Sequence, residues 1–263
     1  PVLDPHPVYF REAVESVLAQ TLTDLELVIV EDPSEVRGTE MIADLRDPRI
    51  RHIVNATRTS LVDQRNQGLH AARGELVALL DADDIAVPAR LQKQVEYLRR
   101  HPDVDVLGSQ LFIIDHQGTQ VGMRSYPLSH ELIVQTMSSY NALAQPSVMA
   151  RKQVLLDAGG YQYRTYPVNE DYELWSRLLA RGVRFANHSE TLLRYRHHPL
   201  GTKTKMLHRM LRATLDVKAQ FWKDEMDVWA KLRFAAEHAL LGLPANVVMR
   251  LFVLTQYISG ERR

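Results

Sequence analysis

Cysteine is absent from the sequence, which excludes disulfide bonds and metal sites built from thiolate ligands. No apolar run reaches the roughly 18 residues that a membrane-spanning helix needs. A charge surplus is also missing, because 32 Lys and Arg residues balance 32 Asp and Glu residues, and this argues against a nucleic-acid partner. A chain without cysteine suits a reducing compartment, so we expect a cytoplasmic protein.

The chain has enough apolar residues, 45% of 263, for one large α/β domain with or without an appendage. Apolar strands alternate with amphipathic helices through about residue 115, which predicts a mostly parallel central sheet flanked by helices. In this part the expected strands are 25–30, 50–54, 75–80 and 104–114, and the expected helices are 9–20, 38–45, 60–72 and 88–98. Farther along we expect strands at 145–149 and 192–196, helices at 152–158 and 172–181, and a helical tail.

The two ends of the chain each carry an expectation. Residues Pro1 to Pro5 are typical of the end of a strand and the turn after it, so we expect the strand itself to lie before Pro1. After Gly201 the tail has eleven Lys and Arg residues against six Asp and Glu residues. This surplus, with apolar residues at helical spacing, permits peripheral contact with the anionic inner face of a membrane, which liposome flotation would detect. A homodimer through the C-terminal helices is the other arrangement left open.

Three carboxylates follow the apolar run 76–80 within four positions: Asp81, Asp83 and Asp84. The run predicts a strand buried on both faces, and ligands of open α/β sheets bind beyond the carboxyl ends of the strands. Carboxylates gathered there repel one another unless a cation joins them, so the pattern indicates Mg²⁺ or Mn²⁺ held by oxygen ligands. A solvated turn is the alternative, because Asp is a good turn former.

Two further sets of residues could join the same edge of the sheet. Glu31 and Asp32 end the strand at 25–30, where a carboxylate could accept the imide N–H of uracil; the alternative is an acidic loop that serves solubility. Arg65, on the helix before the acidic loop, could stack on a base or pair with a phosphate. A solvated helix face is the alternative for Arg65.

The second half offers a candidate base and a candidate anion site. Glu170 and Asp171 open a helix, where acids also serve as caps, but a carboxylate fixed there is well placed to act as a general base. His198 and Lys203 belong to a run of histidines, hydroxyls and lysines around Gly201, which suits a diphosphate and its metal. A structural or solvent-facing role is the alternative for these side chains.

Taken in order, these residues resemble the family 2 glycosyltransferases, which have the GT-A fold. The resemblance runs from Pro1 to about Lys205, and its order and spacing are more specific than any single motif. The segments that carry it are Pro1-Val2, residues 11–21, 30–34, 65–68, 72–74, 80–84, Pro146-Ser147, Gly159-Gly160-Tyr161, Glu170-Asp171-Tyr172 and His198-Pro199.

The resemblance implies a role for each matching position. Asp81 would face the ribose, Asp83 would bind Mn²⁺ or Mg²⁺, and Asp171 would be the catalytic base. Around them, the nucleotide would be held by Pro1, Val2, Glu31, Asp32, Arg65 and Ala82, the metal or diphosphate by His198 and Lys203, and the donor sugar and acceptor by Gly159, Gly160, Tyr161 and Glu170.

The sequence departs from the family pattern at three places. Glu31 stands where Asp is usual, Pro33 where Gly is frequent and Asp4 where Asn is common, all three near the expected contacts to the base. The Gln-x-x-Arg-Trp sequence of processive members is absent after Asp171, which favours transfer of a single sugar.

Together these features predict an inverting, metal-dependent glycosyltransferase that moves one sugar from a UDP-sugar to a hydroxyl of a saccharide or lipid-linked acceptor, in surface polysaccharide or glycolipid assembly. The GT-A domain is expected at 1–204, with a nucleotide-binding half at 1–115 and an acceptor half at 116–204, followed by a helical extension at 205–263. A sugar nucleotidyltransferase and a non-catalytic module that binds sugar nucleotides are the two alternatives.

Overall fold

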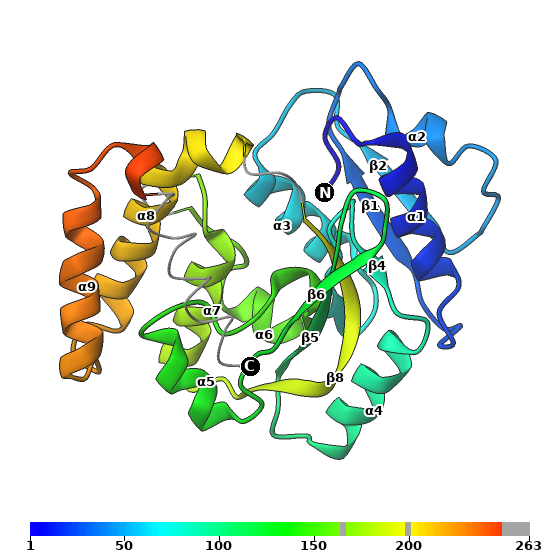
Figure 1. Ribbon diagram of the computed structural model, residues 1–263. Coiled ribbons are helices and arrows are strands. Elements are labelled where there is room, and N and C mark those ends of the chain that lie inside the picture. The colour runs from blue at the N-terminus through cyan, green and yellow to red at the C-terminus, as the bar shows by residue number, and fades with distance from the viewer. Residues whose placement is uncertain (164–166, 198–200, 249–263) are drawn as a thin grey trace.

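The computed structural model describes residues 1–163, 167–197 and 201–248, except for the side chains of residues 201–205. Strands form two sheets in the middle of the molecule, and helices cover them (Figure 1). The α/β class expected from the sequence is therefore confirmed. None of the described helices combines the length and the apolar character needed to cross a lipid bilayer.

The first sheet is small and parallel. It pairs β1 (Leu27–Glu31) with β2 (Ile50–Val54), and the helices around it are α1 (Pro7–Leu18) and the short α2 (Gly38–Met41). Phe10 and Val14 of α1 pack with Ile29 of β1 in one buried cluster. This is the outcome expected from the helical spacing of apolar residues in the first helix.

Helix α3 (Leu61–Ala71) begins where its capping residues predict. Ser60 accepts a hydrogen bond from the Asp63 backbone, and the Asp63 side chain accepts one in return from the Ser60 backbone. The two reciprocal bonds satisfy two backbone donors that a helix start leaves open. They fix the start of the helix that carries Arg65.

The second sheet is mixed, with strand order β3-β7-β5-β8-β4 and with β6 paired to β5. Its strands are β3 (Leu76–Ala78), β4 (Ile85–Ala86), β5 (Val106–Ile114), β6 (Gln120–Arg124), β7 (Met149–Arg151) and β8 (Phe185–Arg196). After α3 the helices along the chain are α4 (Arg90–Arg100), α5 (His130–Met137), α6 (Lys152–Asp157), α7 (Glu170–Ala180), α8 (Gly201–Phe221) and α9 (Val228–Leu240).

The expectation of a mostly parallel sheet is wrong in its detail. Among the described residues β5 and β8 form a parallel pair, but β3 with β7, β4 with β8, and β5 with both β6 and β7 are antiparallel. The turn Asp115–Gly118 explains one of these pairs, because so short a connection can join only antiparallel strands. The irregular second half of the chain supplies the returning strands.

The strand before the acidic loop also differs from expectation. β3 has three residues rather than six, and its side chains are half-buried or exposed rather than buried on both faces. β3 lies at the end of the strand order, and among the described residues only β7 pairs with it. The predicted strand 145–149 is in fact a turn of 3₁₀ helix at Gln145–Ser147 followed by β7.

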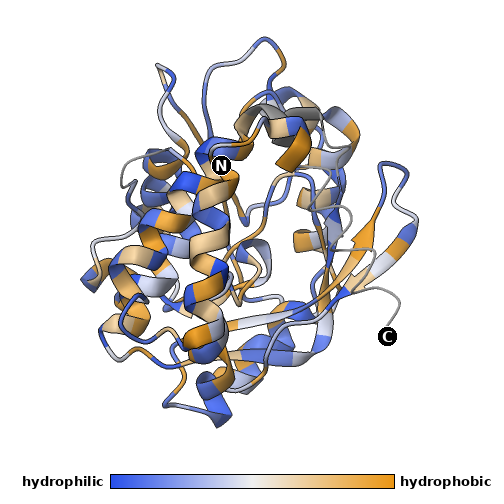
Figure 2. Cartoon of the chain, turned by 60° about the vertical axis from the view of Figure 1, so that its left-hand side comes forward, coloured by the Kyte–Doolittle hydropathy of each residue, from blue (hydrophilic) through white to orange (hydrophobic). Residues whose placement is uncertain are grey.

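The main core gathers around α7. Trp175 is fully buried and packs edge-on against both Tyr161 and Phe185. The predicted helical tail packs onto this core through α8, and the Trp222 indole donates a 2.9 Å hydrogen bond to the Ser176 hydroxyl. The helices nearest the viewer in Figure 2 carry both hydrophilic and hydrophobic residues along their length, as expected of helices with one buried face.

Two glycines with positive φ offer a matched test of backbone strain. Gly160 has φ of 65°, and a Cβ there would lie 2.4 Å from Asn66 Oδ1; Gly118 has φ of 80°, and nothing lies within 4 Å. Gly118→Ala should cost about 1 kcal/mol for the left-handed backbone alone. Gly160→Ala should cost about 3 kcal/mol, because it also displaces the Asn66 amide from its hydrogen bonds. Urea denaturation of both variants measures the difference, and equal losses would contradict this assignment.

Candidate functional site

Arg65 lies between carboxylates from the two halves of the chain. Its Nη2 is 3.6 Å from Asp81 Oδ1, in the loop after β3, and 3.4 Å from Glu170 Oε1, at the start of α7. The structure thus brings together three of the residues that the sequence analysis selected. The two acidic groups are separated by about ninety residues in sequence, and one guanidinium faces both.

The Arg65 guanidinium is buried, charged and only partly satisfied. Burial alone would lower its pKa, but Asp81, Tyr161 and the carboxylates of Glu170 and Asp171 outweigh this and raise it. Its Cζ lies 5.4 Å from the centre of the Tyr161 ring. Nε and Nη1 have no hydrogen-bond partner within the described part of the chain. Two buried donors left over beside acidic groups suit a ligand that brings its own oxygens.

The loop after β3 concentrates negative charge, with Asp81 and Asp83 half-buried. Burial raises the pKa of Asp81, and Asp83 and Glu170 add to this while Arg65 opposes it. Asp84 is fully buried, and its pKa lies well above the usual range because of burial and of Asp81. Carboxylates arranged in this way hold a hard divalent cation well, because the cation removes their mutual repulsion.

Arg90, on α4, is a buried cation whose charge interacts with the Asp84 and Asp81 carboxylates of this loop. It is 1% exposed, and burial lowers its pKa to about 10 although Asp84 and Asp81 work in the opposite direction. The guanidinium donates to the Leu79 carbonyl, 2.7 Å away, at the end of the β3 segment. This hydrogen bond fixes the backbone just before the acidic loop, and the positive charge of Arg90 offsets part of the negative charge of the loop.

Asp171 has the properties of a general base. Its Oδ2 accepts a 3.0 Å hydrogen bond from the Asn141 side-chain amide. Burial and the neighbouring Glu170 carboxylate raise its pKa to about 6. A carboxylate with this pKa is ionised at neutral pH and is a stronger proton acceptor than an ordinary Asp.

Glu31 and Asp32 are buried and already engaged with the protein. Glu31 accepts from the backbone N–H groups of Gly38 and Thr39 at the start of α2, and its Oε2 lies 2.7 Å from His52 Nε2. Asp32 accepts from Asn55 and Thr59, and these hydrogen bonds lower its pKa in spite of burial. A direct contact of either side chain with a nucleotide stays a prediction.

The Gly159-Gly160-Tyr161 turn is fixed next to Arg65. Asn66, the next residue on α3, accepts from the Tyr161 N–H and donates to the Tyr161 carbonyl. Arg177 of α7 donates to the Gly160 carbonyl at 2.7 Å and forms a buried ion pair with Glu173. Tyr161 is 2% exposed, and its hydroxyl accepts from the Gln145 amide. The turn therefore ties α3 to α7, the two helices that carry Arg65 and Asp171.

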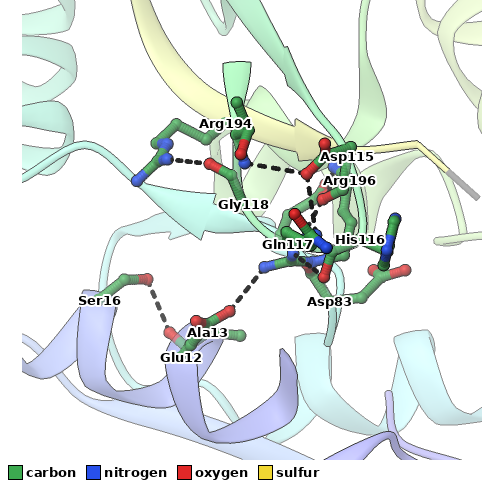
Figure 3. Close-up of polar contacts among 12 residues, drawn as sticks. Glu12, Ala13, Ser16, Asp83, Asp115, His116, Gln117, Gly118, Arg194 and Arg196 are labelled. Carbon is green, nitrogen blue, oxygen red and sulfur yellow. Dashed lines mark hydrogen bonds and ion pairs between the residues drawn. The ribbon is translucent and has the colours of Figure 1, made fainter. Parts of the chain in front are cut away.

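Arg196, at the end of β8, was not selected from the sequence. Its backbone N–H donates to Asp84 Oδ1 at 2.8 Å, and its Nε donates to the Asp83 carbonyl at 2.9 Å. Nη1 reaches the Asp115 carbonyl, and Nη2 pairs with Glu12 at 2.6 Å (Figure 3). This 1% exposed arginine joins the acidic loop to α1 and to the β5–β6 turn. No local pattern in the sequence signals such a role, because its partners come from three distant segments.

The predicted metal and diphosphate ligands are only partly visible. His198 lies outside the described residues, and Lys203 lies on α8 among residues whose side chains are not described. No group of three or more His, Cys, Asp or Glu residues within the described ranges is arranged to hold a metal ion by itself. The metal assignment for Asp83 and His198 therefore stays a prediction.

Val2 shows how the first residues reach the site. Its backbone forms a parallel bridge with Glu31, donating to the Val30 carbonyl and accepting from the Asp32 N–H. Pro1 lines the same cavity as Arg65 and Asp81. Ala82 sits in the acidic loop and packs against the cluster around α1 and β1.

Comparison with known proteins identifies the family. The model of the family named Glycosyl transferase family 2 matches residues 7–156. An uncharacterised glycosyltransferase of Methanocaldococcus jannaschii is 32% identical over 72% of this chain and 66% of its own length. The O-antigen biosynthesis glycosyltransferase WbnJ of Escherichia coli is 30% identical over 76% of this chain and 78% of its own. The chain thus spans just under two thirds of the first of these relatives.

Solved structures establish the fold. TarS 1-349 of Staphylococcus aureus in complex with UDP-GlcNAc has a TM-score of 0.60 and 18% identity, covering 89% of this chain and 67% of its own. The mannosyltransferase PcManGT of Pyrobaculum calidifontis, in complex with GDP-Man and Mn²⁺, has a TM-score of 0.63 and 14% identity, covering 97% and 78%. The GT-A fold expected from the sequence is confirmed.

Arg196 and its neighbour Arg194 form a matched pair for mutation. Arg196→Lys keeps the charge but cannot replace the planar set of donors, so several buried carbonyl groups lose their partners. We expect a loss of about 2–4 kcal/mol in the free energy of unfolding. Arg194→Lys removes a single hydrogen bond to the Gly118 carbonyl and should cost no more than about 1 kcal/mol. Guanidinium denaturation compares the two, and similar losses would show that Arg196 does not join these segments.

Proposed function

The chain belongs to glycosyl transferase family 2, and from this premise we propose that it transfers one sugar, with inversion, from a UDP-sugar to a hydroxyl acceptor. One observation carries the proposal: Arg65 faces Asp81 on one side and Glu170 on the other, next to Asp171. A donor held at Asp81 and an acceptor held at Asp171 would then meet across this guanidinium. The two halves of the sequence, 1–115 and 116–204, would supply the two sides.

The identity of the donor rests on chemistry and on likeness. TarS binds UDP-GlcNAc and PcManGT binds GDP-Man, so nucleotide-sugar binding is common to both structural relatives. A uracil base would use Asp32, whose side chain is fully buried and bonded to Asn55 and Thr59, so the imide N–H would have to replace one of these hydrogen bonds. WbnJ acts in O-antigen biosynthesis, which supports a saccharide or lipid-linked acceptor in surface polysaccharide or glycolipid assembly.

The proposed reaction is a single displacement. The acceptor hydroxyl oxygen forms a bond to the anomeric carbon while the bond from that carbon to the diphosphate oxygen breaks. Asp171 takes the hydroxyl proton, and Asn141 holds its carboxylate in place. Because attack comes from the face opposite the diphosphate, the anomeric configuration inverts and no covalent sugar–protein intermediate forms.

A divalent cation fits the acidic loop. Asp81, Asp83 and Asp84 bring oxygen ligands together in one loop, where burial first and the neighbouring carboxylates second raise the pKa of Asp81 and of Asp84. Mn²⁺ or Mg²⁺ bound there would neutralise the charge of the departing diphosphate. Asp83 is the proposed main ligand, and Lys203 and His198 would act on the diphosphate side. The division into two domains, peripheral membrane contact and a homodimer stay predictions.

Asp171→Asn keeps the shape of the side chain and removes the base. Transfer should slow about 10²–10⁴-fold while UDP binding and folding change little. In the native chain, kcat/KM should fall as the pH drops through about 6, because Asp171 becomes protonated below its raised pKa. Glu170→Gln serves as control and should do less. Unchanged turnover per folded Asp171→Asn molecule, with a lower melting temperature, would make Asp171 a helix cap.

Asp83→Asn tests the metal assignment independently of turnover. Calorimetry of UDP binding with and without Mn²⁺ should show that the metal strengthens binding to the native chain and does so much less in the variant. Glu75→Gln, an exposed carboxylate at the other end of β3, should leave the effect of the metal intact. A variant at Asp83 that keeps the full effect of Mn²⁺ would move the metal ligand elsewhere.

A further inference from the structure

The backbone at Asn169, directly before Glu170 and Asp171, has a conformation that residues other than glycine rarely adopt. Its φ is 60° and its ψ is 31°, and Asp4 is the other non-glycine residue with a positive φ among those described. The left-handed region is unfavourable for a residue with a Cβ, although Asn tolerates it better than most. Such a conformation persists where surrounding contacts impose it, so contacts of Asn169 must hold it in place.

The side chain of Asn169 does not cap helix α7. A residue at this position usually has an extended backbone, and its side chain accepts a hydrogen bond from an N–H group of the first turn. Asn169 makes no such side-chain bond within the described residues, and its carbonyl accepts the Glu173 N–H at 3.1 Å. The ordinary reason for an Asn at the start of a helix is therefore missing here.

The side-chain amide of Asn169 binds helix α8 instead. Its Nδ2 donates to the Thr214 hydroxyl at 2.7 Å and to the Met210 carbonyl at 3.1 Å. Met210 and Thr214 are four residues apart, so they lie on one face of α8. The amide thus joins the start of α7 to the side of α8.

The backbone direction at Asn169 decides where the next two side chains lie. Glu170 Oε1 is 3.4 Å from the Arg65 guanidinium, and Asp171 accepts the Asn141 amide at 3.0 Å. Both partners belong to other segments of the chain, so neither moves with α7. A change of φ and ψ at Asn169 would therefore turn the start of α7 and displace both carboxylates from these partners.

A second contact between α7 and α8 offers a comparison. The Trp222 indole donates to the Ser176 hydroxyl at 2.9 Å, and both residues are buried. Ser176 lies five residues after Asp171, farther along α7. This contact docks α8 on the core, whereas the Asn169 contact lies at the acidic residues of the site. The two contacts can therefore be separated by mutation.

We propose that Asn169 is a positioning residue for the base: its bonds to α8 hold the left-handed turn that places Asp171 against Asn141. This inference rests on the proposed function, because it takes Asp171 as the base. It also gives α8 a part in the reaction that is distinct from docking the helical tail on the core.

Four substitutions separate the side-chain contact from the backbone conformation. Asn169→Gly keeps the left-handed turn without strain and removes the amide, and Asn169→Asp keeps the shape of the side chain but cannot donate. Thr214→Val removes the hydroxyl acceptor and keeps the shape, whereas Thr214→Ser keeps the hydroxyl.

The first readout needs neither donor nor acceptor. The side-chain amide of Asn141, followed by nitrogen-15 NMR, reports its bond to Asp171. In both Asn169 variants its resonance should move toward that of a solvent-exposed amide, because Asp171 is displaced. Thr214→Val should give a smaller shift in the same direction, since the bond to Met210 remains, and Thr214→Ser should give none.

The second readout is the transfer reaction. In Asn169→Gly, kcat should fall about tenfold or more while the Kd for UDP changes less than about twofold, because the base moves and the nucleotide side does not. Adding Thr214→Val to Asn169→Gly should cause little further loss, because both changes remove one contact. Trp222→Phe is the matched control. It should lower the melting temperature by several degrees and leave the Asn141 resonance and kcat per folded molecule unchanged.

Two results would overturn the inference. The first is an Asn169→Gly variant with the native Asn141 resonance and the native kcat, in which case the side chain of Asn169 does not position the base. The second is an equal loss of kcat in Asn169→Gly and Trp222→Phe, which would assign the effect to the docking of α8 as a whole. A native chain that releases no UDP with any acceptor would contradict the proposed function instead, and the Asn141 resonance would still decide whether Asn169 positions Asp171.

Discussion

The burial or partial burial of neighbouring carboxylates, together with their mutual repulsion, is the constraint on which this site depends. Asp81, Asp84 and Asp171 all have raised pKa values, and burial is the first cause for each. Such a cluster persists only when positive charge is built in beside it. Arg65 supplies that charge between the loop after β3 and the start of α7. Two buried donors of Arg65, Nε and Nη1, have no partner among the described residues, and we propose that they receive oxygens of a ligand.

Other arginines hold this cluster in shape without competing for a ligand. Arg90 supports the end of the β3 segment through the Leu79 carbonyl, and Arg177 supports the Gly159-Gly160 turn through backbone carbonyls. Arg196 does the same for the acidic loop and binds α1 to it (Figure 3). Donation to carbonyl groups positions a loop while leaving its carboxylate oxygens available. One arginine can bond to several carbonyl groups in this way because its guanidinium has about five N–H donors.

Local patterns in the sequence predicted the parts of the fold that local physics decides. The Ser60 cap, the strand at 50–54 and the α7 helix begin or lie where expected, because capping and apolar spacing act within a few residues. The mixed sheet was not predicted, since its antiparallel pairs of β7 with β3 and β5 and of β8 with β4 form between segments that are distant in the chain. For the site, the sequence selected Arg65, Asp81, Glu170 and Asp171, and the structure places these four together. No pattern in the sequence indicated Arg196 or Asn141, because their partners are distant in the chain.

The central claim is that this cluster breaks the bond between a sugar and a nucleoside diphosphate. Phosphorus-31 NMR of the chain with a UDP-sugar, Mg²⁺ and a mixture of saccharide acceptors tests it directly. We expect the UDP-sugar resonances to be replaced by those of UDP, because the bond at the anomeric carbon breaks and the diphosphate stays intact. Release of sugar 1-phosphate would contradict it, because that product requires attack at the α-phosphorus and transfer of the uridylyl group, which is the reaction of a nucleotidyltransferase.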